Sequence, residues 1–174
     1  FIECMSGHGI RSARKHFPGH GSATGDTHDG FVDVSRTWTP AELEPYKTLM
    51  AQGFSGMVMV AHVTLKPYGD LPADLNPGII NGLLRHDLGW QGAVVTDDLQ
   101  MKAIASHYSL EETILLSVNA GADLLVFGNN TGRHDPDIAA KAHAALMRHI
   151  NEGRISPERI RESWLRLQKV KDAR

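Results

Sequence analysis

Short apolar stretches alternate with longer amphipathic stretches along this chain of 174 residues. Residues 10–17 are predicted to form a first strand, and residues 56–63, 92–96 and 122–127 three more. The stretch 56–63, which reads GMVMVAHV, is almost continuously apolar. Such a run is typical of a strand that is buried on both faces, as in a parallel sheet.

Helix-start signals lie between and after the predicted strands. Thr39 to Glu42 form a capping box with Pro40 at the first helical position, and a second capping box spans Ser109 to Glu112. Glycines follow three of the helices at the point where each is expected to end. The sequence therefore predicts helices over 39–52, 76–88, 109–120, 137–151 and 158–171, after a first helix that ends near residues 7–9.

The order of these elements predicts the fold class. Strand and helix alternate four times before a final helix, which indicates an α/β fold with a parallel sheet and right-handed crossovers. Four such units fill nearly all of the chain, whereas a closed eight-unit barrel takes about 250 residues. We therefore expect residues 1–174 to be the C-terminal half of a (β/α)8 TIM barrel. A small doubly wound sheet is the alternative.

The start of the chain supports the half-barrel interpretation. The chain opens on Phe1, in FIECMSGHG, without an initiator methionine and in the middle of a helical pattern. We expect an N-terminal barrel half to be missing from this chain, so the absence of a signal peptide carries no information.

Composition narrows the class of protein without revealing its chemistry. Hydrophobic residues make up 41% and charged residues 22% of the chain, which is typical of one globular domain. The net charge of −2 gives no electrostatic footprint for nucleic acid, and no apolar run approaches the roughly 20 residues of a membrane span. Cys4 is the single cysteine, which excludes an internal disulfide and fits a cytoplasmic protein.

A glycine-rich loop follows the first predicted strand. Lys15 to His28 read KHFPGHGSATGDTH, and the proline and glycines cannot continue a strand or a helix. Asp26 beside His28 can fix the imidazole tautomer, and an imidazole that titrates near ~6.5 suits proton transfer at neutral pH. The same tripeptide D-T-H also fits an ordinary turn.

Polar residues gather at the predicted strand ends, which lie on one face of a parallel sheet. The first three strands end in Lys15 and His16, in His62, and in Asp97 and Asp98; Asn129 and Asn130 follow the fourth. Directly after an apolar strand, the Asp97 carboxylate is expected to face the barrel mouth as a nucleophile, metal ligand or general base. Asp98 is the better candidate for capping the following turn.

A metal site is the main chemical alternative, because His16, His20, Asp26, His28 and His62 are residue types that bind metals. However, a proline and a glycine separate His16 from His20, so the two cannot share a helical face as in H-E-x-x-H. The sequence contains no cysteine pair, and the glycine-rich loop lacks the G-K-[ST] ending of a phosphate-binding loop. We therefore predict no metal and no cofactor.

Four segments, in this order and spacing, resemble family 3 glycoside hydrolases. They are KHFPGHG, D-T-H, the strand ending V-A-H, and GAVVTDDLQM, and the resemblance runs from Phe1 to about Asn130. The chain is most similar to the single-domain bacterial β-N-acetylglucosaminidase branch, which acts in peptidoglycan recycling.

The resemblance implies roles for individual residues. Asp97 matches the family's catalytic nucleophile, and His28, with Asp26 as its partner, matches the general acid/base on a mobile loop. The family's usual D-S-H reads D-T-H here, which leaves both functional members in place.

The resemblance also implies how the substrate is held. Lys15 and His16 match residues that hydrogen-bond the sugar at the −1 position, and His62 matches a residue at the floor of the same pocket. The implied partner is a saccharide that contains N-acetylglucosamine, and no metal or organic cofactor is implied.

The implied reaction is release of terminal β-linked N-acetylglucosamine through a covalent glycosyl-aspartate. In the family other sugar contacts come from the first barrel half, so we expect that half to be required in cis or in trans, and the isolated chain to be weakly active or inactive. A phosphorylase variant, a metal-dependent hydrolase on the same barrel face and a non-catalytic sugar-binding remnant are the alternatives.

Overall fold

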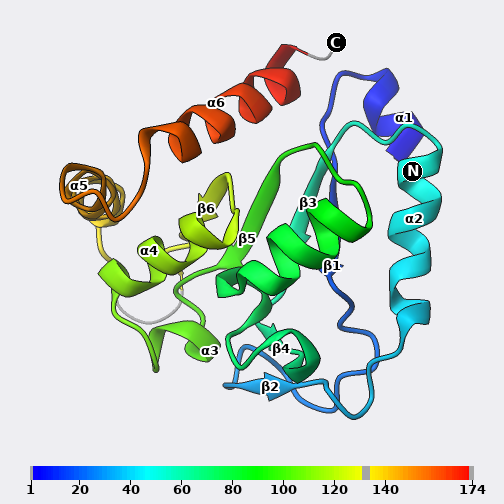
Figure 1. Cartoon of the computed structure of the whole chain (residues 1–174), viewed down its shortest axis with the longest axis horizontal. Helices are drawn as coiled ribbons and strands as arrows, with labels where there is room; N and C mark the ends of the chain where they lie inside the picture. Colours follow the sequence, from blue (N-terminus) through cyan, green and yellow to red (C-terminus); the bar gives the residue numbers. More distant parts are fainter. Residues whose placement is uncertain (1, 131–133, 173–174) are drawn as a thin grey trace.

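A parallel four-stranded sheet forms the centre of the protein, which we describe from a computed structural model for residues 2–130 and 134–172. The strands are β1 (Ala13–Phe17), β3 (Met57–Val60), β5 (Val94–Asp98) and β6 (Leu124–Val126), and they lie side by side in that order (Figure 1). The sheet order therefore follows the chain order. A doubly wound sheet reverses its strand order at a switch point, so this topology is the barrel type.

The helices follow the predicted order with some changes in type. They are α1 (Ile2–Gly7), η1 (Pro40–Leu43), α2 (Glu44–Ala51), η2 (Lys66–Tyr68), η3 (Ala73–Leu75), η4 (Gly78–Asp87), α3 (Lys102–Ala105), α4 (Leu110–Ala120), α5 (Ile138–Asn151) and α6 (Pro157–Asp172). Residues 76–88 were expected to be an α-helix, but η4 is a π-helix. Phe1, from which the first predicted helix starts, lies outside the described residues.

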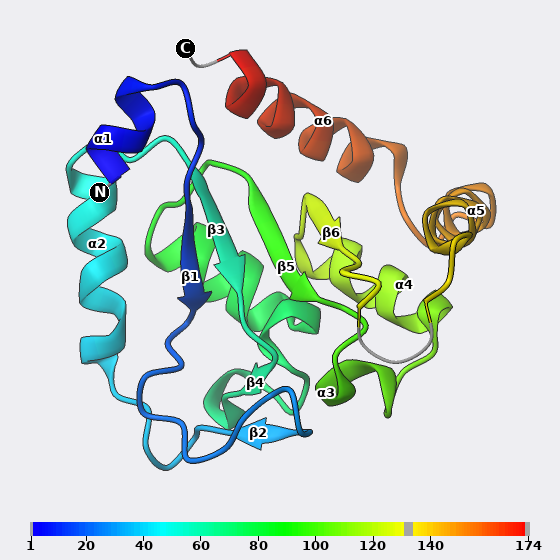
Figure 2. The same ribbon diagram turned by 180° about the vertical axis from the view of Figure 1, so that it is seen from behind.

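Helices cover one face of the sheet. In Figure 1, η4 and α4 lie in front of the strands, and Figure 2 turns the opposite face of the strands toward the viewer. No helix of residues 2–130 and 134–172 crosses that opposite face in Figure 2. A TIM barrel has this arrangement, with its helices outside and the inner face of its sheet turned toward the remaining strands. The fold is thus the C-terminal part of a TIM-barrel-like domain.

One capping box has the predicted structure and the other does not. At α4, the Glu112 N–H donates to Ser109 Oγ over 3.3 Å and the Ser109 N–H donates to Glu112 Oε2 over 2.9 Å. Thr39, by contrast, makes no side-chain capping hydrogen bond, and a 3-10 turn precedes α2. The Glu42 N–H donates to the Thr39 carbonyl over 3.0 Å, and the Glu42 carboxylate accepts from the backbone N–H of Ser22, also over 3.0 Å.

The loop after β1 contains a strand that the sequence did not predict. β2 (Val32–Asp33) pairs in parallel with β4 (Val63–Thr64) as a separate two-stranded sheet. The predicted strand 56–63 is therefore two strands in the structure: β3, which ends at Val60, and β4. His62 lies in the short connection between the two pieces.

The core has two parts. The larger part packs η4 and the loop after β1 against the sheet, with Phe17, Val60, Ile80 and Leu84 wholly buried. The smaller part packs α4 against α5 around Ile114.

A buried carboxylate holds the amino-terminal end of the sheet. Asp123, just before β6, accepts from Arg85, Arg159 and Arg166 at 2.8, 3.0 and 3.1 Å, and also from the Val94 N–H at 2.9 Å. Burial alone would raise the pKa of Asp123, but the guanidinium groups keep it below its usual value. This cluster ties η4 and α6 to the end of the sheet opposite Asp97. Such bonds at the amino-terminal end of a barrel act in stability.

None of the helices within residues 2–130 and 134–172 has the length and apolar character needed to span a membrane.

Candidate active site

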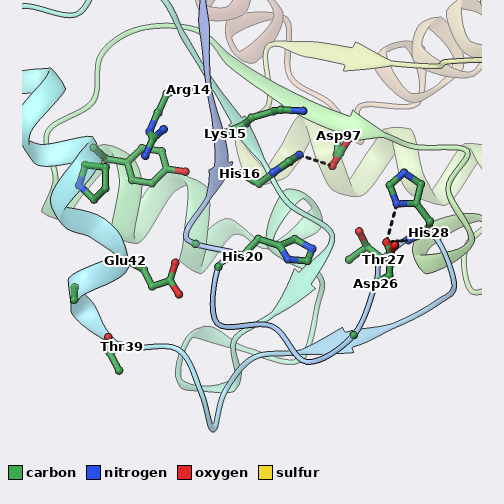
Figure 3. Close-up of a pocket in the computed structure, with 16 residues that line it drawn as sticks. Arg14, Lys15, His16, His20, Asp26, Thr27, His28, Thr39, Glu42 and Asp97 are labelled. Carbon is green, nitrogen blue, oxygen red and sulfur yellow. Dashed lines mark hydrogen bonds and ion pairs between the residues drawn. The ribbon is translucent and has the colours of Figure 1, made fainter.

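The carboxyl ends of β1 and β5 open into a pocket of about 920 Å³ (Figure 3). Five of the six predicted site residues line it: Lys15, His16, Asp26, His28 and Asp97. These residues come from β1, from the loop that follows it and from β5, so the fold brings together side chains that are far apart in the sequence.

Asp97 is the penultimate residue of β5, and a neighbouring group approaches each of its two carboxylate oxygens. Oδ1 accepts the N–H of Asp98 over 2.9 Å, and Oδ2 lies 3.5 Å from Nε2 of His16. The side chain is 19% exposed, so it is partly desolvated but still open to the pocket. A carboxylate with a fixed orientation and one accessible face has the geometry of a nucleophile.

His16 is a neutral partner for that carboxylate. Burial lowers the pKa of His16; Asp97 opposes this effect, while nearby Lys15 and His20 add to it. A neutral imidazole can donate one N–H and accept at its other nitrogen. His16 can therefore hydrogen-bond either Asp97 or a hydroxyl group in the pocket.

Asp26 and His28 form a pair on the exposed loop between β1 and β2. Nδ1 of His28 lies 2.7 Å from Oδ1 of Asp26, which also accepts the backbone N–H of His28 over 2.9 Å. These two bonds lower the pKa of Asp26, so it is ionised at neutral pH. Because a carboxylate can only accept, Nδ1 carries a proton, and Nε2 is the nitrogen that can gain or lose a second one.

The loop that carries this pair is anchored on both sides of it. Before the pair, Glu42 accepts from Ser22 and lies so close to Gly19 that a Cβ there would meet the Glu42 Cβ at 2.5 Å. After the pair, β2 joins β4, and Thr27 within the pair is itself buried. The anchors confine the loop beside Asp97, while the His28 ring stays 71% exposed.

His62 lies beneath the strand ends and is not among the residues that line the pocket. Its side chain is wholly buried, Nε2–H donates to the Asp98 carbonyl over 2.8 Å, and Nδ1 lies 2.9 Å from Oδ2 of Asp74, which is also wholly buried. Burial alone would lower the pKa of His62, but the Asp74 carboxylate and the Asp98 carbonyl raise it to about 9. Burial also raises the pKa of Asp74, an effect that the neighbouring imidazole opposes. We assign the pair as imidazolium and carboxylate at neutral pH, because each group stabilises the charge of the other; the role of His62 in binding substrate stays a prediction.

Asp98 caps the turn after β5, as expected from its sequence. Its Oδ1 accepts the N–H groups of Gln100 and Gly128, each over 3.0 Å. A Cβ at Gly128 would lie 2.4 Å from Asp98 Oδ2, so any other residue at this position requires the Asp98 carboxylate or the loop to move. Asn129, which also follows a strand, accepts from the Asp135 N–H through its side chain over 2.9 Å and is not among the pocket-lining residues.

Three residues of the far pocket wall were not predicted. Arg14 lies 5.3 Å from the ring centroid of Tyr46, and Glu42 stands beside them (Figure 3). Burial raises the pKa of the Tyr46 hydroxyl. The only available signal was the position of Arg14 next to Lys15 in the first strand; nothing local linked it to α2.

Within the described ranges 2–130 and 134–172, no three histidine, cysteine or acidic side chains are grouped so as to hold a metal ion. His16 and Asp97 approach each other, and so do Asp26 and His28, but these are pairs.

Relatives and solved structures resemble this chain closely enough to define its family. A β-hexosaminidase from Tolumonas auensis is 34% identical over 75% of this chain, which corresponds to 40% of that protein. A glycoside hydrolase family 3 β-N-acetylglucosaminidase from a Paenibacillus species superposes with a TM-score of 0.88 at 36% identity, over 99% of this chain and 32% of its own. Zinc-bound CbsA from Thermotoga neapolitana superposes with a TM-score of 0.82 at 28% identity, over 94% of this chain and 35% of its own.

This chain thus spans well under half the length of these three proteins. The family model described as the glycosyl hydrolase family 3 N-terminal domain matches residues 1–170. With nearly every residue covered by that model, the chain belongs to glycosyl hydrolase family 3.

Proposed function

We propose that the full-length protein containing this chain is a retaining glycoside hydrolase that releases terminal β-linked N-acetylglucosamine. The supporting observation is that the Asp97 carboxylate and the Asp26–His28 pair line one pocket at the carboxyl end of the sheet. The relatives named β-hexosaminidase and β-N-acetylglucosaminidase support the substrate class.

Asp97 is the nucleophile in this proposal. Its carboxylate attacks the anomeric carbon and forms a glycosyl ester, while His28 gives a proton to the departing oxygen. In the second step His28 takes a proton from water, which attacks the same carbon and frees Asp97. Asp26 stays ionised, holds the imidazole by Nδ1 and stabilises the positive charge that His28 carries before the first step and regains in the second.

Lys15 and His16 act on the substrate in this proposal. His16 is half-buried beside Asp97 and Lys15 is exposed at the pocket wall, so both side chains can reach the hydroxyls of a sugar held against Asp97. Bonds that strengthen as the ring approaches its oxocarbenium-like transition state raise the rate rather than only the affinity.

The barrel is completed by an N-terminal half in this proposal, supplied in cis or in trans. Among the described residues, β1 and β6 are the outer strands of the four-stranded sheet, and Leu124 of β6 is 40% exposed. Open strand edges next to exposed apolar side chains favour pairing with further strands. The sequence resemblance extends the proposal to peptidoglycan recycling in the cytoplasm.

Covalent labelling tests the proposal directly. The full-length protein is incubated with an activated fluorinated N-acetylglucosaminide, digested and examined by mass spectrometry. We expect a glycosyl adduct on Asp97, and loss of both the adduct and turnover in Asp97→Ala. Asp87→Asn, at an exposed carboxylate on η4 outside the pocket lining, is the matched control and should keep full activity. An adduct on another residue would overturn the assignment of Asp97.

A metal-dependent hydrolase is the second candidate, because one related structure holds zinc. Exhaustive chelation of the full-length protein separates the two. Full activity after chelation supports the glycosidase, and loss of activity that zinc restores supports the metal-dependent reaction. Phosphate buffer in the same assay separates hydrolysis from phosphorolysis by the product formed.

A further inference from the structure

An ion pair with no exposed surface lies behind the pocket. The side chains of His62 and Asp74 are both 0% exposed, and their charged atoms are 2.9 Å apart. Moving such groups out of water costs several kcal/mol for each ion, and a buried pair is therefore weak evidence for stability. The second contact of the imidazole, at Nε2, suggests a role for the pair other than stability.

The His62 imidazole is hydrogen-bonded to the backbone next to Asp97, the proposed nucleophile. Nε2–H of His62 donates to the carbonyl of Asp98, whose own N–H donates to Oδ1 of Asp97. Asp98 is thus held at its carbonyl, at its N–H and, through Gln100 and Gly128, at its side chain. A residue held at three points offers its N–H to Asp97 in one fixed direction.

We propose that the His62–Asp74 pair is a positioning device, which fixes the Asp98 backbone so that its N–H orients the Asp97 carboxylate for attack. This inference rests on the proposed function of Asp97. Asp74 fixes the imidazole, the imidazole fixes the carbonyl of Asp98, and neither side chain meets the substrate because neither reaches the pocket surface.

Charge gives the pair a second effect on the reaction. The imidazolium of His62 lies close enough to Asp97 for their electrostatic attraction to raise the pKa of His62. A positive charge behind Asp97 stabilises the negative charge that this side chain regains when the ester is hydrolysed. Preorganised charge in a water-free site is a large contribution to catalysis.

The fold supplies a matched control for this pair. His149 of α5 is also buried, and its Nε2 lies 2.9 Å from a backbone carbonyl, that of Glu111. It packs between α4 and α5 and is not among the residues that line the pocket. A defect that follows only from losing a buried histidine must therefore appear in both places.

The test compares Asp74→Asn, His62→Gln and His149→Gln in the full-length protein. In Asp74→Asn and His62→Gln we expect kcat and the rate of Asp97 labelling to fall about 10- to 100-fold, which is the usual loss when a residue that orients a functional side chain is removed. KM should change by less than about threefold. Asp74→Asn keeps the shape and removes the charge. His149→Gln should lower the melting temperature comparably and leave kcat within about twofold.

Variants at position 62 or 74 that fold and keep kcat within about twofold overturn the positioning role. A raised KM at unchanged kcat also overturns it, in favour of contact between His62 and the substrate. A wild-type protein without an adduct on Asp97 overturns the proposed function and the inference together, whereas a labelled wild type with unimpaired variants overturns the inference alone.

A measurement on the wild-type protein tests the inference even if the variants do not fold. Esterification of Asp97 by the fluorinated sugar removes a negative charge near His62, so the NMR signals of both ring N–H groups of His62 should shift, while those of His149 stay in place. Unchanged His62 signals in the labelled protein overturn the inference.

Discussion

His28 directs Nδ1 at Oδ1 of Asp26 over 2.7 Å, although both side chains are more than half exposed. The two residues are separated only by the buried Thr27, and the His28 N–H closes the turn by donating to Asp26 Oδ1 over 2.9 Å. The pair is therefore assembled locally, and the fold contributes its position beside Asp97.

Removal of the His28 imidazole should slow the reaction more for a poor leaving group than for a good one. We expect His28→Ala to lower kcat/KM, which reports the first step, about 100- to 1,000-fold for an unactivated saccharide, because the departing oxygen then receives no proton from the enzyme. A nitrophenyl leaving group needs little protonation, so its kcat/KM should fall far less. Steady-state kinetics with both substrates measure the difference.

His86 provides the control, because its Nδ1 lies 2.7 Å from Oδ1 of Asp87 in an equally exposed pair outside the pocket lining. His86→Ala should leave kcat unchanged. Equal losses for the two leaving groups in His28→Ala would contradict a role in proton transfer.

Stability should fall as the pH rises through the titration of His62. Its pKa in the folded protein is about 9, above the ordinary value of 6.5, so the stabilisation is fully present below pH 6.5 and is lost as the pH approaches 9. The loss is on the order of 3 kcal/mol. Urea unfolding at intervals between pH 6 and pH 9.5 measures it, and Asp74→Asn, which removes the carboxylate partner, should flatten the curve. A wild-type curve already flat over this interval would contradict an imidazolium at position 62.

Loss of the Asp123 carboxylate should destabilise the protein without affecting substrate binding. Asp123→Ala leaves Arg85, Arg159 and Arg166 without their shared partner, and breaking a buried pair in this way costs about 3–5 kcal/mol. The free energy of unfolding measures the loss. Glu44→Ala breaks an exposed pair with Lys47 and should change that free energy by less than about 1 kcal/mol. A changed KM in a folded Asp123→Ala protein would argue against a purely structural role.

A methyl group at Gly128 should disturb the cap that holds Asp98. It would lie 2.4 Å from Asp98 Oδ2, so the carboxylate or the loop must move, and Gly128→Ala should destabilise the protein by about 1–3 kcal/mol. We also expect a lower kcat, because Asp98 donates its N–H to Asp97. At Gly7 a methyl group meets nothing within 4 Å, so Gly7→Ala should be neutral. An unchanged melting temperature for Gly128→Ala would show that the cap is dispensable.

The sequence by itself determined the order of strands and helices and the end of the strand at which the polar residues gather. Both depend on patterns within a few residues: apolar runs, glycines after helices, and Asp97 directly after GAVVT. The Asp26–His28 pair and the role of Asp98 as a cap were predictable for the same reason, since each is made of neighbours in the chain.

Tertiary structure alone decided the contacts between distant segments. Glu42 holds the loop at Ser22 instead of capping its helix with Thr39, β2 pairs with β4 inside a stretch expected to be a loop, and Asp74 reaches His62 beneath the pocket. These contacts carry no local periodicity, because a buried polar side chain takes its partner from whichever element packs against it. For this reason the sequence predicted candidate residues for the chemistry, and only the packing of the chain determined which of them face the pocket and which lie behind it.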